Sequence, residues 1–332
     1  MRAFLFAALL LSVLSIVPAQ ATARGASQDT DHDGLSDALE NALLTQFAPR
    51  FMVSSDDCAG RPAQFVPSLA QPVVQREDGT IYGQAFPRGG HANEVELHFY
   101  HLWGSDCGEM GHNLDTEHVS ALVQRGPDSK WEALYWYAAA HEDTVCDASQ
   151  IARAAAVDGE VRGPRVWISR GKHASFLSDA LCTHGCGGDI CRAMEPLATA
   201  KIVDLGELSA PMNGAIWVDS PEWPLAVKMS RSDFVAARTA RVDDLPVASI
   251  AWANPGKRPM EAAILSGNDA VGGATTGLRA ADTALDTADS HTGVALNSAA
   301  SGTGKSLART LHNVKKALHA TAWNVGNALQ AR

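Results

Sequence analysis

Short runs in which apolar and polar residues alternate are the feature that most limits the fold of this chain of 332 residues. Side chains two apart on a β-strand share one face, so alternation predicts a strand with one buried face. In the run VELHFYHLW, this places Val95, Leu97 and Phe99 on one face. The expected strands are 95–103, 117–125, 131–140, 164–169 and 215–218. Gly, Pro and Asp turns separate them, which predicts a mainly β protein, an antiparallel β-sandwich with peripheral helices and a C-terminal helix.

Changes in composition divide the chain into five expected segments. They are a signal peptide (1–23), a loop and helix module (24–50), the β-sandwich domain (51–260), a low-complexity linker (261–302) and an amphipathic helix (303–332). The β-sandwich segment carries nearly all the aromatic residues and cysteines, whereas the linker is rich in Gly, Ala, Ser, Thr and Asp.

The N-terminal sequence MRAFLFAALLLSVLSIVPAQATA combines one positive charge, an apolar run and the small residues ATA. This pattern is typical of a secretory signal peptide cleaved after Ala23. An uncleaved membrane anchor is the alternative, but the apolar run of about 15 residues is shorter than a spanning helix needs. We therefore expect a secreted or periplasmic protein. Its net charge of −10 makes general binding of nucleic acid unfavourable.

Six cysteines follow the signal peptide, and an even number in an exported chain predicts up to three disulfides. Fifteen pairings are possible, and the spacing does not choose among them. The segment CTHGCGGDIC could instead hold zinc through its cysteines and His184, although its spacing matches no established zinc motif.

The segment DTDHDGLSDALE, residues 29–40, matches every fixed position of the calcium-loop pattern D-x-[DN]-x-[DN]-G-x5-E. The expected ligands are the side chains of Asp29, Asp31, Asp33, Asp37 and Glu40 and the backbone carbonyl of Leu35, with Asp37 acting directly or through water. Oxygen ligands at this density predict Ca²⁺ in a structural role. The alternative is an acidic cap on the following helix, with Asp33 or Ser36 as the capping residue.

The segment GHNLDTEHV concentrates histidines and carboxylates where a strand begins. Asp115 and Glu117 are two apart and would share a face, where they repel unless a cation or partner joins them. His112 could approach from the preceding turn and Asp106 from the neighbouring hairpin arm, whereas His118 would point to the other face. Such a donor set suits Mg²⁺, Ca²⁺ or Mn²⁺, and the alternative is a polar turn with hydrogen-bonded carboxylates.

The same segment resembles the G-H-x-H-D-W-E-H-V motif of the necrosis- and ethylene-inducing-like proteins. FAPRF, DDCAGRPAQFVP and VELHFYHLWGSDC are similar to other parts of that family, in the same order. YAAAHED and WISRGKHASFL look like motifs of a related family associated with vacuolar protein sorting. The resemblance covers residues 44–178.

In the necrosis-inducing family this motif and an upstream aspartate bind a divalent cation in the cavity of a β-sandwich. Carried over by position, the resemblance implies Asp106, His112, Asp115 and Glu117 as ligands. The chain has Leu114 and Thr116 where the family has His and Trp. These departures concern toxin activity more than the cation site.

Polar residues near the expected strand ends allow an enzyme as an alternative. They are His141, Glu142, Asp143, His173 and Ser175, of which His141 and His173 are the catalytic candidates. With His112 and Glu117 they could form an acid/base pair around a metal-bound water. No G-x-S-x-G nucleophile motif is present.

Residues 303–332 have apolar residues at helical spacing and contain no acid. Such a helix could pack on its own domain, or make peripheral contact with a membrane surface or a partner.

Three functions are compatible with the sequence. The first is cation-dependent binding to a cell-surface carbohydrate or lipid, with toxin-like activity as an extension. The others are a metal-dependent hydrolase and a structural envelope protein stabilised by calcium.

Overall fold

The computed structural model describes residues 28–258, except 109–110, 143, 187, 200, 208–209, 217–219, 221–222, 224–225 and 227–248. The expected signal peptide, linker and C-terminal helix lie outside these residues, as does Asp143. All the described residues belong to one compact unit.

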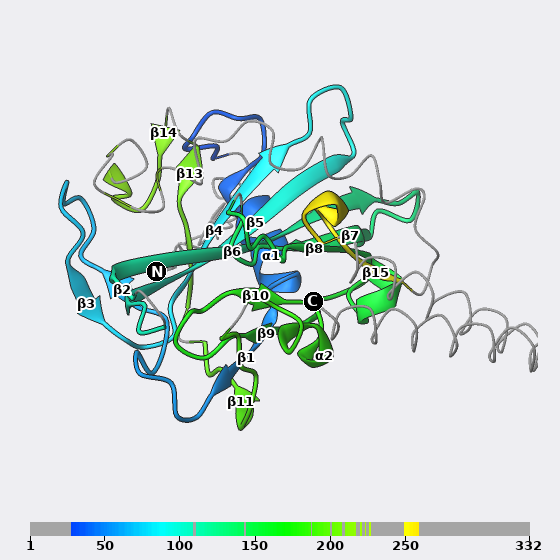
Figure 1. Ribbon diagram of the computed structural model, residues 1–332. Coiled ribbons are helices and arrows are strands. Elements are labelled where there is room, and N and C mark those ends of the chain that lie inside the picture. Colours follow the sequence, from blue (N-terminus) through cyan, green and yellow to red (C-terminus); the bar gives the residue numbers. More distant parts are fainter. Residues whose placement is uncertain are drawn as a thin grey trace, which may run out of the picture. The chain divides into compact units, whose positions relative to one another are not determined.

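Two larger β-sheets form the body of the protein (Figure 1). The seven-stranded sheet has the order β12 (Ile202–Asp204), β4 (Ile81–Pro87), β5 (Glu94–Ser105), β6 (Asn113–Arg125), β7 (Trp131–Ala138), β8 (Gln150–Arg153) and β15 (Ile250–Trp252). The four-stranded sheet has the order β10 (Ser175–Phe176), β9 (Arg165–Ile168), β1 (Arg50–Ser54) and β11 (Met194–Pro196). Most neighbouring strands are antiparallel. The pairs β1–β9 and β12–β4 are the parallel exceptions among the described strands, and the predicted, mainly antiparallel architecture is confirmed.

Smaller elements surround these sheets. Two two-stranded sheets pair β2 (Gln64–Phe65) with β3 (Val74–Arg76) and β13 (Gly206–Glu207) with β14 (Ala210–Pro211). The helices are α1 (Asp37–Gln46), α2 (Asp179–Cys182) and the 3₁₀ turns η1 (Ala154–Val157) and η3 (Pro255–Lys257). None of the described helices has the length and apolar character needed to cross a membrane.

The hydrophobic alternation correctly located β5, β6, β7 and β9. Val95, Leu97 and Phe99 are at most 2% exposed and belong to one core cluster. The expected strand at 215–218 is wrong in its described residues, which are not in a strand. Asn213 and Gly214 have φ values of 53° and 77° and form a turn directly before them. A local apolar run could not reveal this change of direction.

The main core lies between the two larger sheets. Phe51 of β1 and Val166 of β9 pack in the same buried cluster as Phe99 of β5, Val119 of β6 and Trp136 of β7. Each of these side chains is at most 2% exposed. Burial from both sheets identifies the fold as a β-sandwich.

Helix α1 closes one side of this core. Ser36 caps it by accepting a hydrogen bond from the backbone N–H of Leu39 at 3.3 Å. Leu43 and Phe47 are 1% and 0% exposed and pack in the main core cluster. The buried side chains of the helix therefore pack in the core of the sandwich.

Gly83 lets α1 approach the seven-stranded sheet, because a Cβ atom there would lie 2.9 Å from Leu44 Cδ1. Leu44 is 1% exposed and has little room to move. We expect Gly83→Ala to lower the free energy of unfolding in urea by about 1–3 kcal/mol through overpacking. Gly89→Ala is the matched control, since a Cβ at Gly89 meets no atom within 4 Å. Equal unfolding free energies for the two variants would contradict this packing.

Three disulfides confirm the prediction from the cysteine count. The pairs are Cys58–Cys107, Cys146–Cys186 and Cys182–Cys191. The alternative zinc site at CTHGCGGDIC is thereby excluded, because its three sulfur atoms are all in disulfide bonds and cannot act as thiolate ligands.

Candidate metal centre

The N-terminal loop before α1 brings three carboxylates together. One oxygen from each of Asp29, Asp31 and Asp33 lies within 4.8 Å of the others. Gly34 has a φ of 97°, which L residues rarely adopt, and it makes the sharp turn that the sequence pattern requires. Three of the predicted ligands therefore meet in the structure, whereas Asp37 and Glu40 are not within this mutual distance of them.

Hydrogen bonds within the loop hold these carboxylates in place. The backbone N–H and the hydroxyl of Thr30 each donate to Asp37 at 2.7 Å, which lowers the pKa of Asp37. The backbone N–H of Gly34 donates to Asp29 Oδ2 at 3.1 Å, and that of Leu35 donates to Asp33 Oδ1 at 2.6 Å. Asp37 therefore joins the two ends of the loop. Because both of its oxygens already accept hydrogen bonds, this arrangement favours binding of a metal through water rather than directly.

The remaining carboxylate oxygens of the loop point into a buried space. Within the described part of the chain, the following have no hydrogen-bond partner: Asp29 Oδ1, both oxygens of Asp31, Asp33 Oδ2 and both oxygens of Glu40. Asp31 is 4% exposed and Glu40 is fully buried. Burying an ionised carboxylate without a partner is strongly unfavourable, so these oxygens require a proton or a cation.

The pKa values of these groups express the same requirement. Burial, followed by repulsion from Asp33 and Asp29, raises the pKa of Asp31 to about 6. Burial, followed by repulsion from Asp204 and the loop acids, raises the pKa of Glu40 to about 9. Burial also raises the pKa of Asp33. A divalent cation would remove the repulsion and favour the charged forms.

The second predicted cluster is only partly gathered. His112 Nε2 lies 3.8 Å from Asp106 Oδ2, and the His112 side chain is 59% exposed. Asp115 and Glu117 lie in β6 and are 9% and 7% exposed. No three donor atoms of these four residues, all of which the structure describes, lie within 4.8 Å of one another. A metal at these residues therefore stays a prediction.

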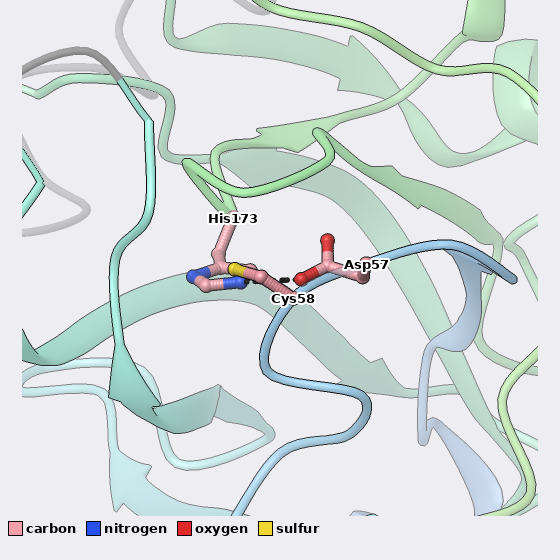
Figure 2. Close-up of side chains that lie close together, drawn as sticks. All are labelled: Asp57, Cys58 and His173. Atoms are coloured by element: carbon pink, nitrogen blue, oxygen red, sulfur yellow. Dashed lines mark hydrogen bonds and ion pairs between the residues drawn. The ribbon is translucent and has the colours of Figure 1, made fainter.

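His173 is buried beside Asp115. On its other side it faces Asp57 (Figure 2). Its Nδ1 lies 3.0 Å from Asp115 Oδ2, and its Nε2 lies 3.3 Å from Asp57 Oδ1. Cys58 is also close, but its sulfur is bonded to Cys107 and is no metal ligand. Asp57 was not among the predicted site residues, because only the fold brings residues 57, 115 and 173 together.

Charge and stacking both favour a protonated imidazole at His173. Burial alone would lower its pKa, but the hydrogen bonds and charges of Asp115 and Asp57 outweigh burial and raise the pKa to about 9. Its ring stacks on Trp103 with centroids 3.9 Å apart, and Trp103 Nε1 donates to His101 Nδ1 at 2.8 Å. His173 thus lies between two carboxylates that favour its charged form, and a catalytic role for it stays a prediction.

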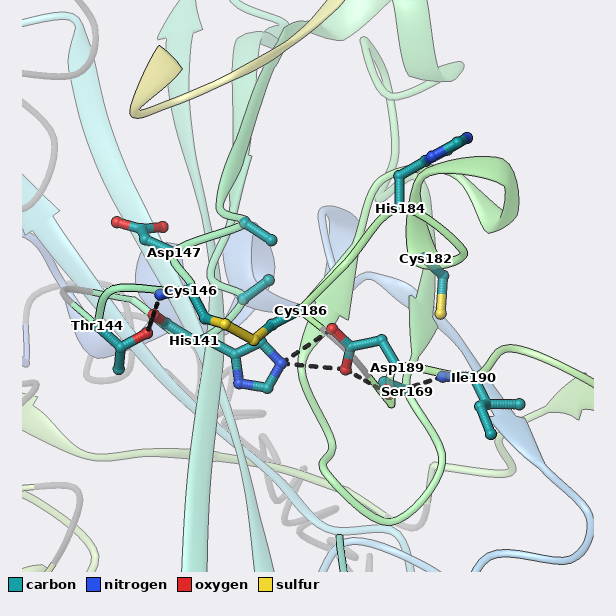
Figure 3. A network of polar contacts seen from close by, with 12 residues as sticks. His141, Thr144, Cys146, Asp147, Ser169, Cys182, His184, Cys186, Asp189 and Ile190 are labelled. Atoms are coloured by element: carbon teal, nitrogen blue, oxygen red, sulfur yellow. Dashed lines mark hydrogen bonds and ion pairs between the residues drawn. A yellow bond between two sulfur atoms is a disulfide. The ribbon is translucent and has the colours of Figure 1, made fainter. Parts of the chain in front are cut away.

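The other catalytic candidate, His141, is also held by a carboxylate (Figure 3). His141 Nε2 lies 3.0 Å from both oxygens of Asp189, and burial opposes the resulting rise in its pKa. The Ser169 hydroxyl donates to Asp189 at 2.8 Å, so the serine bonds the carboxylate and not the imidazole. A nucleophile activated by histidine requires the opposite arrangement.

A cavity that the sequence did not reveal lies beside β12. Its volume is about 410 Å³. Its lining includes Asn41 of α1, Gln64, Phe65, Tyr82, Lys201, Asp204 and Asn213. Amide groups, aromatic rings, one cation and one carboxylate thus come from segments far apart in sequence, which explains why no local motif indicates the cavity.

Comparisons with known proteins give structural matches only. No family model and no curated protein matches the sequence, so membership of a family stays a prediction. The matching solved structures include toxin-fold proteins. A triple mutant of NLPPya is 12% identical with a TM-score of 0.34, covering 58% of this chain and 80% of its own. NLPPya in complex with glucosamine is 12% identical with a TM-score of 0.33, covering 52% and 75%. Non-toxic HaNLP3 is 10% identical with a TM-score of 0.31, covering 56% and 88%.

These structures include necrosis- and ethylene-inducing-like proteins, to which the sequence motifs were similar. All three TM-scores lie below 0.5. The similarity therefore transfers neither ligands nor residue roles to this chain.

Proposed function

We propose that this chain is an exported, calcium-binding β-sandwich protein that binds a cell-surface glycan in a calcium-dependent way. The observation that carries the proposal is the set of buried oxygens of Asp31 and Glu40 that have no hydrogen-bond partner among the described residues. Three disulfides support export, because such bonds persist in oxidising compartments.

The donor set favours calcium over other divalent cations. Four acids, Asp29, Asp31, Asp33 and Glu40, present six buried oxygens without hydrogen-bond partners among the described residues. Calcium takes six to eight oxygen ligands in flexible geometry, whereas magnesium requires a near-ideal octahedron and usually keeps several waters. A second divalent cation at Asp106, His112, Asp115 and Glu117 is proposed separately, from the sequence motif.

The cavity beside β12 suits a glycan. Its volume of about 410 Å³ falls in the usual range for small-ligand sites. The amides of Asn41, Gln64 and Asn213 can both donate and accept hydrogen bonds with sugar hydroxyls. Phe65 and Tyr82 form a buried, aromatic part of the cavity wall. This mixture favours a hydroxylated ligand over the acyl chain of a lipid.

Calcium and the cavity share structural elements, which explains the proposed dependence. Asn41 lines the cavity and directly follows Glu40 in α1. Asp204 lines the cavity and lies close enough to Glu40 to raise its pKa. Loss of the ion would leave these buried carboxylates repelling one another and would disturb the cavity wall.

The proposal is tested by glycan-array binding of the full chain with calcium and with chelator. We expect chelator, Asp31→Asn in the loop and Gln64→Ala in the cavity each to lower binding at least tenfold. Lys130→Ala, in the exposed turn between β6 and β7, is the control and should bind as wild type. Glycan binding that persists unchanged in chelator would contradict calcium dependence. Binding that Gln64→Ala leaves unchanged would contradict the cavity.

The alternative functions remain distinguishable in the same preparation. A metal-dependent hydrolase would turn over a substrate in a chelator-sensitive way, with His141 and His173, each beside a carboxylate, as its candidate residues. An envelope protein stabilised by calcium would bind the ion and no glycan. Membrane contact through 303–332 concerns residues outside the described structure.

A further inference from the structure

We propose that Asp204 and Glu207, from the sandwich, are further ligands in the divalent-cation site of the N-terminal loop. This inference rests on the proposed calcium site and extends its ligands beyond the loop motif. Asp204 ends β12 and Glu207 lies in β13, more than 160 residues after the loop.

Strand pairing and helix packing bring Asp204 against Glu40. In the parallel pair β12–β4, Asp204 lies directly beside Gly83. Leu44 packs on Gly83, as the close approach of its Cδ1 shows. Glu40 precedes Leu44 by four residues and so lies on the same face of α1. Glu40 therefore faces the end of β12, where Asp204 is the acidic residue.

Both added carboxylates have an oxygen ready for a ligand. Asp204 is 2% exposed, and Gly206 N–H donates to its Oδ1 at 3.2 Å. Its Oδ2 is buried and has no hydrogen-bond partner in the described part of the chain, and the same holds for Glu207 Oε1. An unpartnered, buried carboxylate oxygen beside the fully buried Glu40 is explained by a shared cation.

The mutual effects on pKa agree with this proximity. Burial, followed by repulsion from Asp31, Asp37 and Asp33, raises the pKa of Asp204 to about 6. Burial, followed by repulsion from Asp33, Asp31 and Asp204, raises the pKa of Glu207 to about 8. Asp204 is in turn the strongest charged neighbour of Glu40. The charged neighbours with the largest effects on these pKa values are all acids, which agrees with the proximity argued from the strand register and helix packing.

The shared site would fasten three segments to one another. The loop supplies Asp29, Asp31 and Asp33, α1 supplies Glu40, and the β12–β13 segment supplies the two added acids. Because Asp204 also lines the cavity, occupancy by the ion would fix one of its walls. Loss of calcium would therefore weaken the proposed ligand binding directly, by releasing this wall of the cavity.

The test measures calcium affinity of the full chain by competition with a chelating dye. Asp204→Asn and Glu207→Gln keep side-chain size and remove one charge each, and we expect each to weaken calcium binding at least tenfold. Glu195→Gln, an exposed acid of β11, removes the same charge elsewhere and should leave affinity unchanged. Near-UV circular dichroism confirms the fold. If Asp204→Asn does not fold, the less buried Glu207→Gln decides.

The outcomes separate this inference from the calcium site itself. Wild-type affinity in both variants, with binding lost in Asp31→Asn, would overturn the added ligands and leave the loop site standing. A wild-type chain that binds no calcium would overturn both. Equal weakening in Glu195→Gln would show a general effect of charge and would also overturn the added ligands.

Discussion

Removing calcium from the full chain is expected to lower its thermal midpoint markedly. The unfolded chain lacks the assembled carboxylates, so calcium binds the folded state and stabilises it by mass action. At free calcium about 1,000-fold above Kd, the stabilisation is about 4 kcal/mol. Asp31→Asn changes a carboxylate whose two buried oxygens have no hydrogen-bond partner in the part of the chain that the structure describes, and it should make the thermal midpoint insensitive to calcium. Differential scanning calorimetry with calcium and with chelator measures both effects.

A matched control separates ion binding from the loss of a charge. Glu132→Gln changes an exposed acid of β7 and should keep the full calcium-dependent shift. Identical midpoints for wild type in calcium and in chelator would mean that the loop acids are neutralised by protons alone. The acidic cap would then be the correct interpretation of residues 29–40.

The second large effect is expected from His173→Asn. This change removes the internal cation and leaves Asp57 and Asp115 facing each other, with side chains 2% and 11% exposed. Breaking a buried ion pair by removing one partner costs about 3–5 kcal/mol. Asparagine tolerates the φ of 54° at this position, so the loss reports on the interactions of the imidazole rather than on the backbone. Urea unfolding measures the free energy.

A double-mutant cycle with Asp57→Asn provides the control. If His173 acts as the cation for this carboxylate, the double variant should lose less stability than the sum of the two single changes. Additive losses, or a loss below about 1 kcal/mol for His173→Asn, would contradict the assigned ion pairs.

The parts of the fold that could be predicted are those with a local physical signal. Alternating side chains located β5 and β6, because a buried strand face repeats every two residues. The loop at 29–40 was recognisable because all its expected ligands lie in one continuous segment of the sequence. The cysteine count predicted disulfides, but their pairing depends on distances that the sequence does not contain.

What could not be predicted comes from contacts between distant segments. Asp57 meets Asp115 only because His173 lies between them in the folded chain. Asp204 meets Glu40 only because β12 pairs in parallel with β4 and α1 packs on Gly83. Neither Asp57 nor Asp204 belongs to a recognisable motif. The motif around Asp115 suggested a metal ligand, whereas in the folded chain Asp115 contacts the imidazole of His173.

The metal content of the purified full chain tests the central claim most directly. After dialysis against trace calcium, elemental analysis of wild type should find calcium bound at the loop, and Asp31→Asn should contain one calcium fewer per chain. Calcium absent from wild type, or present in equal amounts in wild type and Asp31→Asn, would contradict a calcium site at residues 29–40.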